Sequence, residues 1–158
     1  SQLIEDILSI IKPMINKNEC TLDVRVENNL PKIKGDKKLL GEALINILMN
    51  SLEAMPRHGR MFIIAEEESY DSGGESTPHI KIDIRDTGPG IPDYQIENIF
   101  DPFFTTKSSG TGLGLSIVSK TIKSHGGFIK VKSKINEGTT FSLFIPLEPN
   151  RQMDDANG

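Results

Sequence analysis

Several features are scarce in this sequence of 158 residues, and each scarcity narrows the classes of protein to which it can belong. Cys20 is the single cysteine, which excludes an internal disulfide and indicates a reducing compartment such as the cytoplasm. No apolar run approaches the roughly 20 residues that span a bilayer, so we expect no membrane insertion. The net charge of -4 provides no basic surface, which argues against a nucleic-acid partner.

The remaining composition is that of a globular protein, since 36% of the residues are hydrophobic and 25% are charged. We expect one domain over residues 1–147 and a disordered tail over 148–158. Apolar periodicity predicts helices over about 3–14, with a kink or early end at Pro13, and over 36–55 and 113–125. It predicts strands at 21–26, 60–66, 79–85, 128–134 and 139–146. The strands at 60–66 and 79–85 are expected to pair, and residues 69–78 between them are rich in Ser, Gly and acidic residues, which predicts a long solvated hairpin loop.

The second predicted helix has two faces of different chemistry. At 100° per residue a polar stripe contains Glu42, Asn46, Asn50 and Glu53, and an apolar face contains Leu40, Leu44, Ile47, Leu48 and Met55. An Asn carbonyl oxygen suits Mg²⁺ that takes further ligands from water and phosphates. For the helix considered alone, a solvated polar face is the alternative interpretation.

Asp86 ends the strand whose sequence is Ile80-Lys81-Ile82-Asp83-Ile84-Arg85. Alternation places its carboxylate on the same face as the three isoleucines, and therefore inward. A buried carboxylate needs hydrogen-bond donors, and the amino group of adenine is a suitable one. The alternative is that Asp86 caps its own turn. Gly88 and Gly90 fit both interpretations, because they permit positive φ and the close approach of a ligand.

The segment Gly110-Thr111-Gly112-Leu113-Gly114-Leu115-Ser116 opens the third predicted helix. Its glycines expose backbone N–H groups at a helix N-terminus, where the helix dipole favours phosphate. No Lys follows the last glycine as in a Walker loop, and Leu115 replaces the third glycine of the Rossmann spacing. A flexible loop is the alternative interpretation.

These segments resemble, in order, the conserved boxes of the catalytic and ATP-binding domain of sensor histidine kinases, within the gyrase, Hsp90, histidine kinase and MutL group. Residues 46–54 resemble the asparagine box, 86–91 the first glycine box, 99–104 the phenylalanine box and 110–116 the second glycine box. The resemblance implies a Bergerat-type α+β fold. In this two-layer sandwich, three helices cover one face of a mixed, mostly antiparallel sheet.

The resemblance also implies roles for individual residues. Asn50 would hold Mg²⁺, Asn46 would support the phosphates, and Asp86 would bind adenine. Lys107 would be a cation for the terminal phosphate, although a solvated surface lysine is the alternative interpretation. Arg57 is a second candidate, because Glu53 stands where some members carry a basic residue. Further contacts to ATP or ADP are implied for Gly88, Gly90, Ile91, Phe100, Phe104, Gly110, Thr111, Gly112, Leu113, Gly114 and Leu115. Residues from about 93 to 109 would form a lid that Phe100, Phe103 and Phe104 anchor, although a small core cluster also explains these phenylalanines.

The resemblance implies partners outside this sequence. None of His58, His79 and His125 is followed by an acidic residue, as a phosphoacceptor histidine would be. We therefore expect a histidine-containing dimerisation domain before Ser1 in a longer parent protein, and a response regulator receiver domain as the final phosphoryl acceptor. Two alternatives are an ATP-gated conformational clamp, which would need a Glu base at the position of Asn46, and an interaction module without nucleotide binding.

Overall fold

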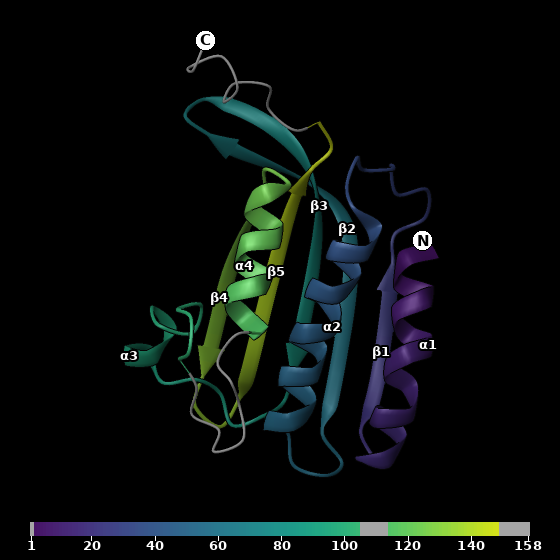
Figure 1. The fold of residues 1–158 in the computed structure, drawn as a ribbon, viewed down its shortest axis with the longest axis vertical. Helices are drawn as coiled ribbons and strands as arrows, with labels where there is room; N and C mark the ends of the chain where they lie inside the picture. Colours follow the sequence, from purple (N-terminus) through teal and green to yellow (C-terminus); the bar gives the residue numbers. More distant parts are fainter. Residues whose placement is uncertain (1, 105–113, 149–158) are drawn as a thin grey trace.

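A computed structural model describes residues 2–104 and 114–148, which form a single five-stranded sheet with helices on one side (Figure 1). The spatial order of the strands is β1-β2-β3-β5-β4, and only the β1–β2 pair is parallel. The strands are β1 (Thr21–Val26), β2 (Arg60–Ser72), β3 (Glu75–Asp86), β4 (Phe128–Lys134) and β5 (Gly138–Pro146). The mixed, mostly antiparallel sheet is therefore confirmed.

The helices are α1 (Gln2–Lys17), α2 (Lys37–Ala54), α3 (Asp93–Ile96) and α4 (Gly114–Ser124). Figure 1 shows α1, α2 and α4 lying on the same face of the sheet, while the short α3 lies apart beside the end of β4. This arrangement confirms the predicted two-layer α+β sandwich. Within the two described ranges, no helix is long and apolar enough to cross a membrane.

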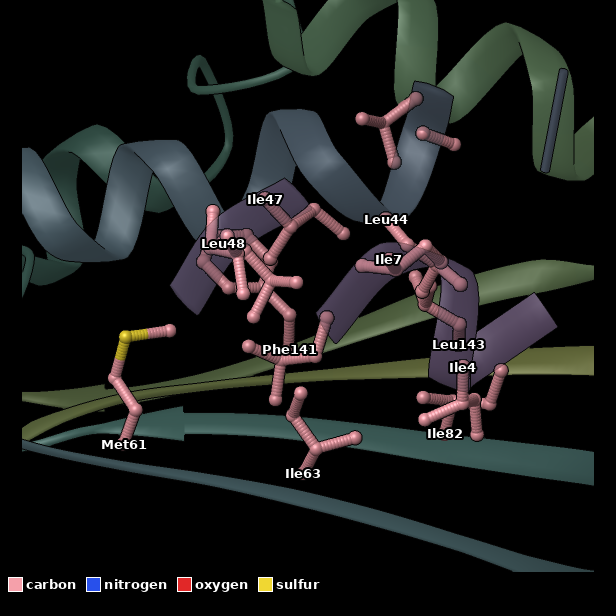
Figure 2. Packing of buried hydrophobic residues seen from close by; sticks show 14 of the residues in the cluster. Ile4, Ile7, Leu44, Ile47, Leu48, Met61, Ile63, Ile82, Phe141 and Leu143 are labelled. Atoms are coloured by element: carbon pink, nitrogen blue, oxygen red, sulfur yellow. The ribbon is translucent and has the colours of Figure 1, made fainter. Parts of the chain in front are cut away.

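The core lies between the helices and the sheet. Figure 2 shows Ile4 and Ile7 of α1 and Ile47 of α2 pointing toward strand side chains such as Ile82 and Leu143. Ile47 and Leu143 are fully buried, in agreement with the alternating and helical patterns that predicted this face. Because each Å² of buried apolar surface contributes about 25 cal/mol to the free energy of folding, this interface is the main source of stability.

Two local predictions were wrong in part. The early end at Pro13 is not observed, because α1 continues to Lys17 with Ile11 and Ile15 buried in the core and Pro13 on the exposed side, while a kink at Pro13 stays a prediction. The predicted hairpin is confirmed, but its loop is not long, because residues 69–72 and 75–78 continue the paired strands β2 and β3 and Ser72 pairs with Glu75. Gly73 and Gly74 alone form the turn, with φ of 63° and 92°, as a two-residue type I′ turn requires.

Candidate nucleotide site

Helix α2 carries the two predicted asparagines. The helix begins where the sequence predicted because the Asp36 carboxylate accepts a hydrogen bond from Leu39 N at 3.0 Å. Asn46 and Asn50, one turn apart, are both half-buried. A methyl group at Gly114, the first residue of α4, would lie 3.9 Å from Asn50 Nδ2 and 4.0 Å from Asn46 Oδ1. The fold therefore brings both amides beside the positive end of the α4 dipole.

Asp86 lies at the same end of the molecule, where β3 ends, and is only 4% exposed. The inward direction predicted for its carboxylate is therefore confirmed. Gly88 N donates to Asp86 Oδ1 at 2.9 Å and Thr139 N donates to the same oxygen at 3.3 Å. Asp86 thus caps its own turn, as the alternative interpretation predicted, and also faces inward, while its hydrogen bond to adenine stays a prediction.

Burial raises the pKa of the Asp86 carboxyl above its ordinary value of 3.8, and the groups around it oppose this only in part. The N–H of Gly88, the hydroxyl of Ser51 and the N–H of Thr139 each favour the ionised form and so lower the pKa. The carboxylate is therefore a desolvated acceptor whose donors among the described residues do not offset its burial. A ligand that donates a hydrogen bond would satisfy such a group.

Ser51 is a residue of this region that the sequence reasoning missed. It follows Asn50 on α2 and is 2% exposed. Its hydroxyl lies close enough to Asp86 to favour the ionised carboxylate, yet not in hydrogen-bond geometry, and Ser51 Oγ has no hydrogen-bond partner among the described residues. The sequence could have indicated this residue, because position 51 falls on the buried face of α2, four residues after Ile47. A buried hydroxyl on that face needs a hydrogen-bond partner.

Residues 86–91 form the turn that we call the base turn. Gly88 is buried, and a methyl group there would lie 3.0 Å from Asp86 Oδ1. Gly90 has a φ of 78°, and a methyl group at this position would overlap the backbone of Lys134, the last residue of β4. The positive φ that the sequence predicted is therefore found at Gly90 but not at Gly88, where the neighbouring Asp86 side chain leaves little room for a methyl group. The close approach of a ligand to both glycines stays a prediction.

The phenylalanine segment is only partly a core cluster. Phe100 and Phe104 are half-buried against the core, and the Phe100 ring lies edge-on to Phe141 with centroids 6.3 Å apart. Phe103 has a φ of 66° and is 74% exposed, so the expectation that it anchors this segment was wrong. Its left-handed backbone conformation is unusual for a bulky residue and directs the ring toward solvent.

Part of the predicted phosphate segment lies outside the described residues, namely Lys107, Gly110, Thr111, Gly112 and Leu113. Their roles stay predictions. Of the other predicted contacts in this segment, Gly114 lies beside the asparagines and Leu115 is half-buried against the core. Arg57, the second candidate cation, is exposed and lies 3.8 Å from Glu19.

Two of the three histidines lie in settings unrelated to the base turn or the asparagines. His58 is exposed and lies 3.6 Å from the Glu19 carboxylate. His79 is 6% exposed and packs edge-on against Tyr70 and Phe128 on the face of the sheet opposite the helices. Both settings explain these residues without a phosphoacceptor role.

His125 joins the end of α4 to the start of α2. Its Nδ1 lies 2.7 Å from Thr121 O, so Nδ1 carries the proton, and Nε2 accepts from Asp36 N at 3.0 Å. Gly35 leaves room for the ring, because a methyl group there would lie 2.9 Å from His125 Cδ2. The two helices that flank the site are therefore also fastened at their opposite ends.

The described residues contain no group of three or more His, Cys, Asp or Glu side chains arranged to hold a metal. The side-chain amide of Asn50 lies on the same side of α2 as the start of α4, and it has interactions of its own within the protein. Neutral oxygen donors of this kind fit Mg²⁺ that is bound mainly through phosphate oxygens.

Comparison with known proteins gives a consistent result. Residues 35–149 match the family described as histidine kinase-, DNA gyrase B-, and HSP90-like ATPase. Sensor histidine kinase ZraS of Escherichia coli (strain K12) is 35% identical over 150 residues, which cover 95% of this chain and 30% of that protein. The chain spans about a third of the length of such curated relatives.

Solved structures agree with this result. The nucleotide-free catalytic domain of histidine kinase ThkA has a TM-score of 0.79 and 33% identity, and the match covers 94% of both chains. Histidine kinase ThkA in complex with response regulator protein TrrA matches with a TM-score of 0.76 and 30% identity over 96% of this chain and 41% of that one.

Proposed function

We propose a phosphoryl-transfer function for this chain, which belongs to the family of histidine kinase-, DNA gyrase B- and HSP90-like ATPases and is the ATP-binding catalytic domain of a histidine kinase. In this proposal, residues 1–147 bind Mg-ATP and present its γ-phosphoryl group to a histidine on a separate dimerisation domain of the same parent protein. The observation that carries the proposal is the meeting of Asp86, the two asparagines of α2 and the start of α4 at one end of the molecule.

The base side of the site rests on Asp86. Its buried carboxylate would accept from the adenine amino group, and the buried Ser51 hydroxyl, which lacks a partner among the described residues, lies beside it. Gly88, Gly90 and Ile91 would shape the surface on which the base lies, with Phe100 and Phe104 supporting the segment that follows. Burial makes these hydrogen bonds stronger than they would be in water.

The phosphate side would be formed by α2 and the beginning of α4. Asn50 would hold Mg²⁺ and Asn46 would orient the phosphates, with the backbone N–H groups of residues 110–115 as further donors. Mg²⁺, when bound, would neutralise charge that develops on the phosphoryl oxygens. Lys107 remains the proposed cation for the terminal phosphate. The role of these residues is to bind and orient ATP, because the attacking nucleophile comes from another domain.

A hydrolytic clamp is less well supported. Activation of water would require a carboxylate base at position 46, and an Asn side chain cannot accept the proton.

An acceptor histidine would also have to come from elsewhere, since His58 and His125 already interact with Glu19 and Asp36. We propose a response regulator as the final acceptor, and a cytoplasmic location for the domain, in keeping with a single buried cysteine.

Calorimetric titration of ATP with and without Mg²⁺ tests this function. Asn50→Ala should leave thermal unfolding of the nucleotide-free domain nearly unchanged and remove most of the Mg²⁺-dependent part of the affinity. The matched control is Glu42→Ala, which removes an exposed side chain from the same stripe of α2 and should change neither quantity. Undiminished Mg-ATP binding by Asn50→Ala would assign that amide to the solvated face and refute the metal role.

A further inference from the structure

The hydroxyl of Ser133, on β4, lies at the centre of a hydrogen-bond network to which the sequence reasoning gave no role. Ser133 Oγ lies 2.7 Å from Ile91 N, 3.1 Å from Gly138 O and 2.8 Å from Thr139 Oγ1. A hydroxyl has one proton and two lone pairs, and Gly138 O can only accept. Ser133 therefore donates to Gly138 O, and it accepts from Ile91 N and from Thr139 Oγ1. Its hydrogen-bonding capacity is fully used.

This network reaches both ends of the base turn. At one end, Ile91 N donates directly to Ser133. At the other end, Thr139 N donates to Asp86 Oδ1 at 3.3 Å, and the Thr139 hydroxyl is held by Ser133. One side chain of β4 is thus connected to the residue that closes the base turn and, through Thr139, to the carboxylate that opens it.

The backbone packing around this network leaves little freedom. Asn136 N donates to Pro89 O at 2.8 Å, so the middle of the base turn is also fixed to the β4–β5 turn. A methyl group at Gly90 would overlap the backbone of Lys134, and one at Gly138 would overlap the backbone of Asp86. The two turns therefore fit backbone to backbone, and the hydrogen bonds of Ser133 hold that fit in register.

We propose that Ser133 is a positioning residue for base recognition. It fastens the base turn to the β4–β5 hairpin and thereby fixes the direction of the Asp86 carboxylate. This inference rests on the proposed function, because it assumes that Asp86 accepts from adenine. Without the hydroxyl, the half-buried N–H of Ile91 and the hydroxyl of Thr139 each lose a partner, and the base turn relaxes away from the hairpin. Asn46 and Asn50 stand on α2, outside the network, so phosphate binding is spared.

The variants Ser133→Ala, Ser133→Thr and Ser142→Ala test the proposal. Ser142 is the matched control, because it lies on neighbouring β5 but on the face of the sheet opposite the helices. For each, we would measure the affinity for Mg-ATP, for Mg-GTP and for Mg-tripolyphosphate, which has phosphates but no base. Ser133→Ala removes all three hydrogen bonds of this hydroxyl, and the half-buried N–H of Ile91 that is left unpaired should alone weaken ATP binding about tenfold.

A positioning role predicts a pattern that a general loss of stability does not. Ser133→Ala should lose ATP affinity and part of the preference for ATP over GTP while it keeps the affinity for tripolyphosphate. Ser133→Thr, which retains the hydroxyl, should keep most of the ATP affinity, and Ser142→Ala should match the parent. The Ile91 amide should exchange with solvent faster in Ser133→Ala, which NMR measures directly.

Two results would overturn the proposal: parental ATP affinity and base preference in Ser133→Ala, or an equal loss of ATP and tripolyphosphate. If Ser133→Ala does not fold, Ser133→Cys, with a weaker acceptor of similar size, should show the same pattern with a smaller loss. Failure of the proposed function itself looks different, because the parent domain would then bind ATP no better than tripolyphosphate. If the proposed function fails, the Asp86→Asn variant would also bind ATP with the same affinity as the parent domain.

Discussion

Replacement of Asp86 by Asn separates what this residue does for stability from what it does for binding. In the nucleotide-free protein the carboxylate is buried, and burial raises its pKa. An Asn side chain has nearly the same shape and can keep the hydrogen bonds from Gly88 N and Thr139 N through its oxygen. The variant therefore removes the desolvated charge but retains the turn, and we expect the free domain to become more stable at neutral pH.

The size and pH dependence of this gain follow from proton linkage. A folded-state pKa above the ordinary value of 3.8 means that the folded protein holds the proton more tightly than the unfolded chain. The stability of the parent therefore falls as pH rises through the raised pKa of Asp86, by about 1.4 kcal/mol for each tenfold difference in proton affinity between the folded and unfolded states. Asp86→Asn lacks this loss. Its advantage should be largest at neutral pH and should vanish at a pH well below 3.8.

ATP binding should change in the opposite direction. The amide that replaces the carboxylate in Asp86→Asn would present a donor, or at best a neutral acceptor, to the adenine amino group. Loss of a hydrogen bond to a charged acceptor costs about 1.5–3 kcal/mol, which is roughly ten- to a hundredfold in affinity. The parent should prefer ATP over GTP, and the variant should lose that preference because its amide can donate to the guanine oxygen.

Urea denaturation at several pH values, together with calorimetric titration of ATP and GTP, measures both effects. Asp23→Asn is the control, because Asp23 is an exposed strand carboxylate with only a weak contact to Arg25 at 3.4 Å, and it should change neither stability nor affinity. Two results would refute this reasoning. The first is a lower free energy of unfolding of Asp86→Asn than of the parent at pH 7, and the second is equal affinity of the parent domain for ATP and GTP.

Three further predictions concern other parts of the chain. Gly41→Ala should stabilise the domain by about 0.5–1 kcal/mol in thermal unfolding, because Gly41 lies inside α2 and the added methyl group, among the described residues beyond its own helix, would meet only Leu3 Cδ1 at 3.4 Å. A large loss would mean that the Leu3 side chain cannot adjust to the methyl group. Gly90→Ala should destabilise by more than about 2 kcal/mol, because the methyl group overlaps Lys134, whereas Gly73→Ala, also at positive φ but in open space, should cost only about 1 kcal/mol. During incubation with γ-labelled ATP, the domain should remain unlabelled and should hydrolyse little ATP. Stable label on any of its histidines would contradict a division of the chemistry between domains.

The sequence predicted those parts of the fold and site that depend on local periodicity. The alternation of Ile80, Ile82 and Ile84 indicated the inward direction of Asp86, and the polar stripe of α2 put Asn46 and Asn50 on one side. These inferences succeeded because a strand has a period of two and a helix a period of 3.6, whatever lies beyond them.

Features that depend on contacts distant in the sequence were not predictable. The polar residues after Glu68 read as a loop, but Tyr70 packs on Phe128 with ring centroids 4.7 Å apart, and Lys130 Nζ lies 4.5 Å from the Tyr70 ring. These contacts hold the hairpin in strand pairing despite its solvated composition. The bond between Ser133 and Ile91 likewise joins residues whose proximity only the folded sheet creates.

The long β2–β3 hairpin extends from the sheet at the end of the molecule opposite the nucleotide site. Its Gly73-Gly74 tip lies at the end opposite α3 and the base turn (Figure 1), and a methyl group added at either glycine would meet no atom of the described residues within 4 Å. A fluorophore or a short epitope introduced at this tip would therefore label the domain in open solvent, far from bound nucleotide. The hairpin thus provides an attachment point for immobilising the domain on a sensor surface with its nucleotide site turned outward.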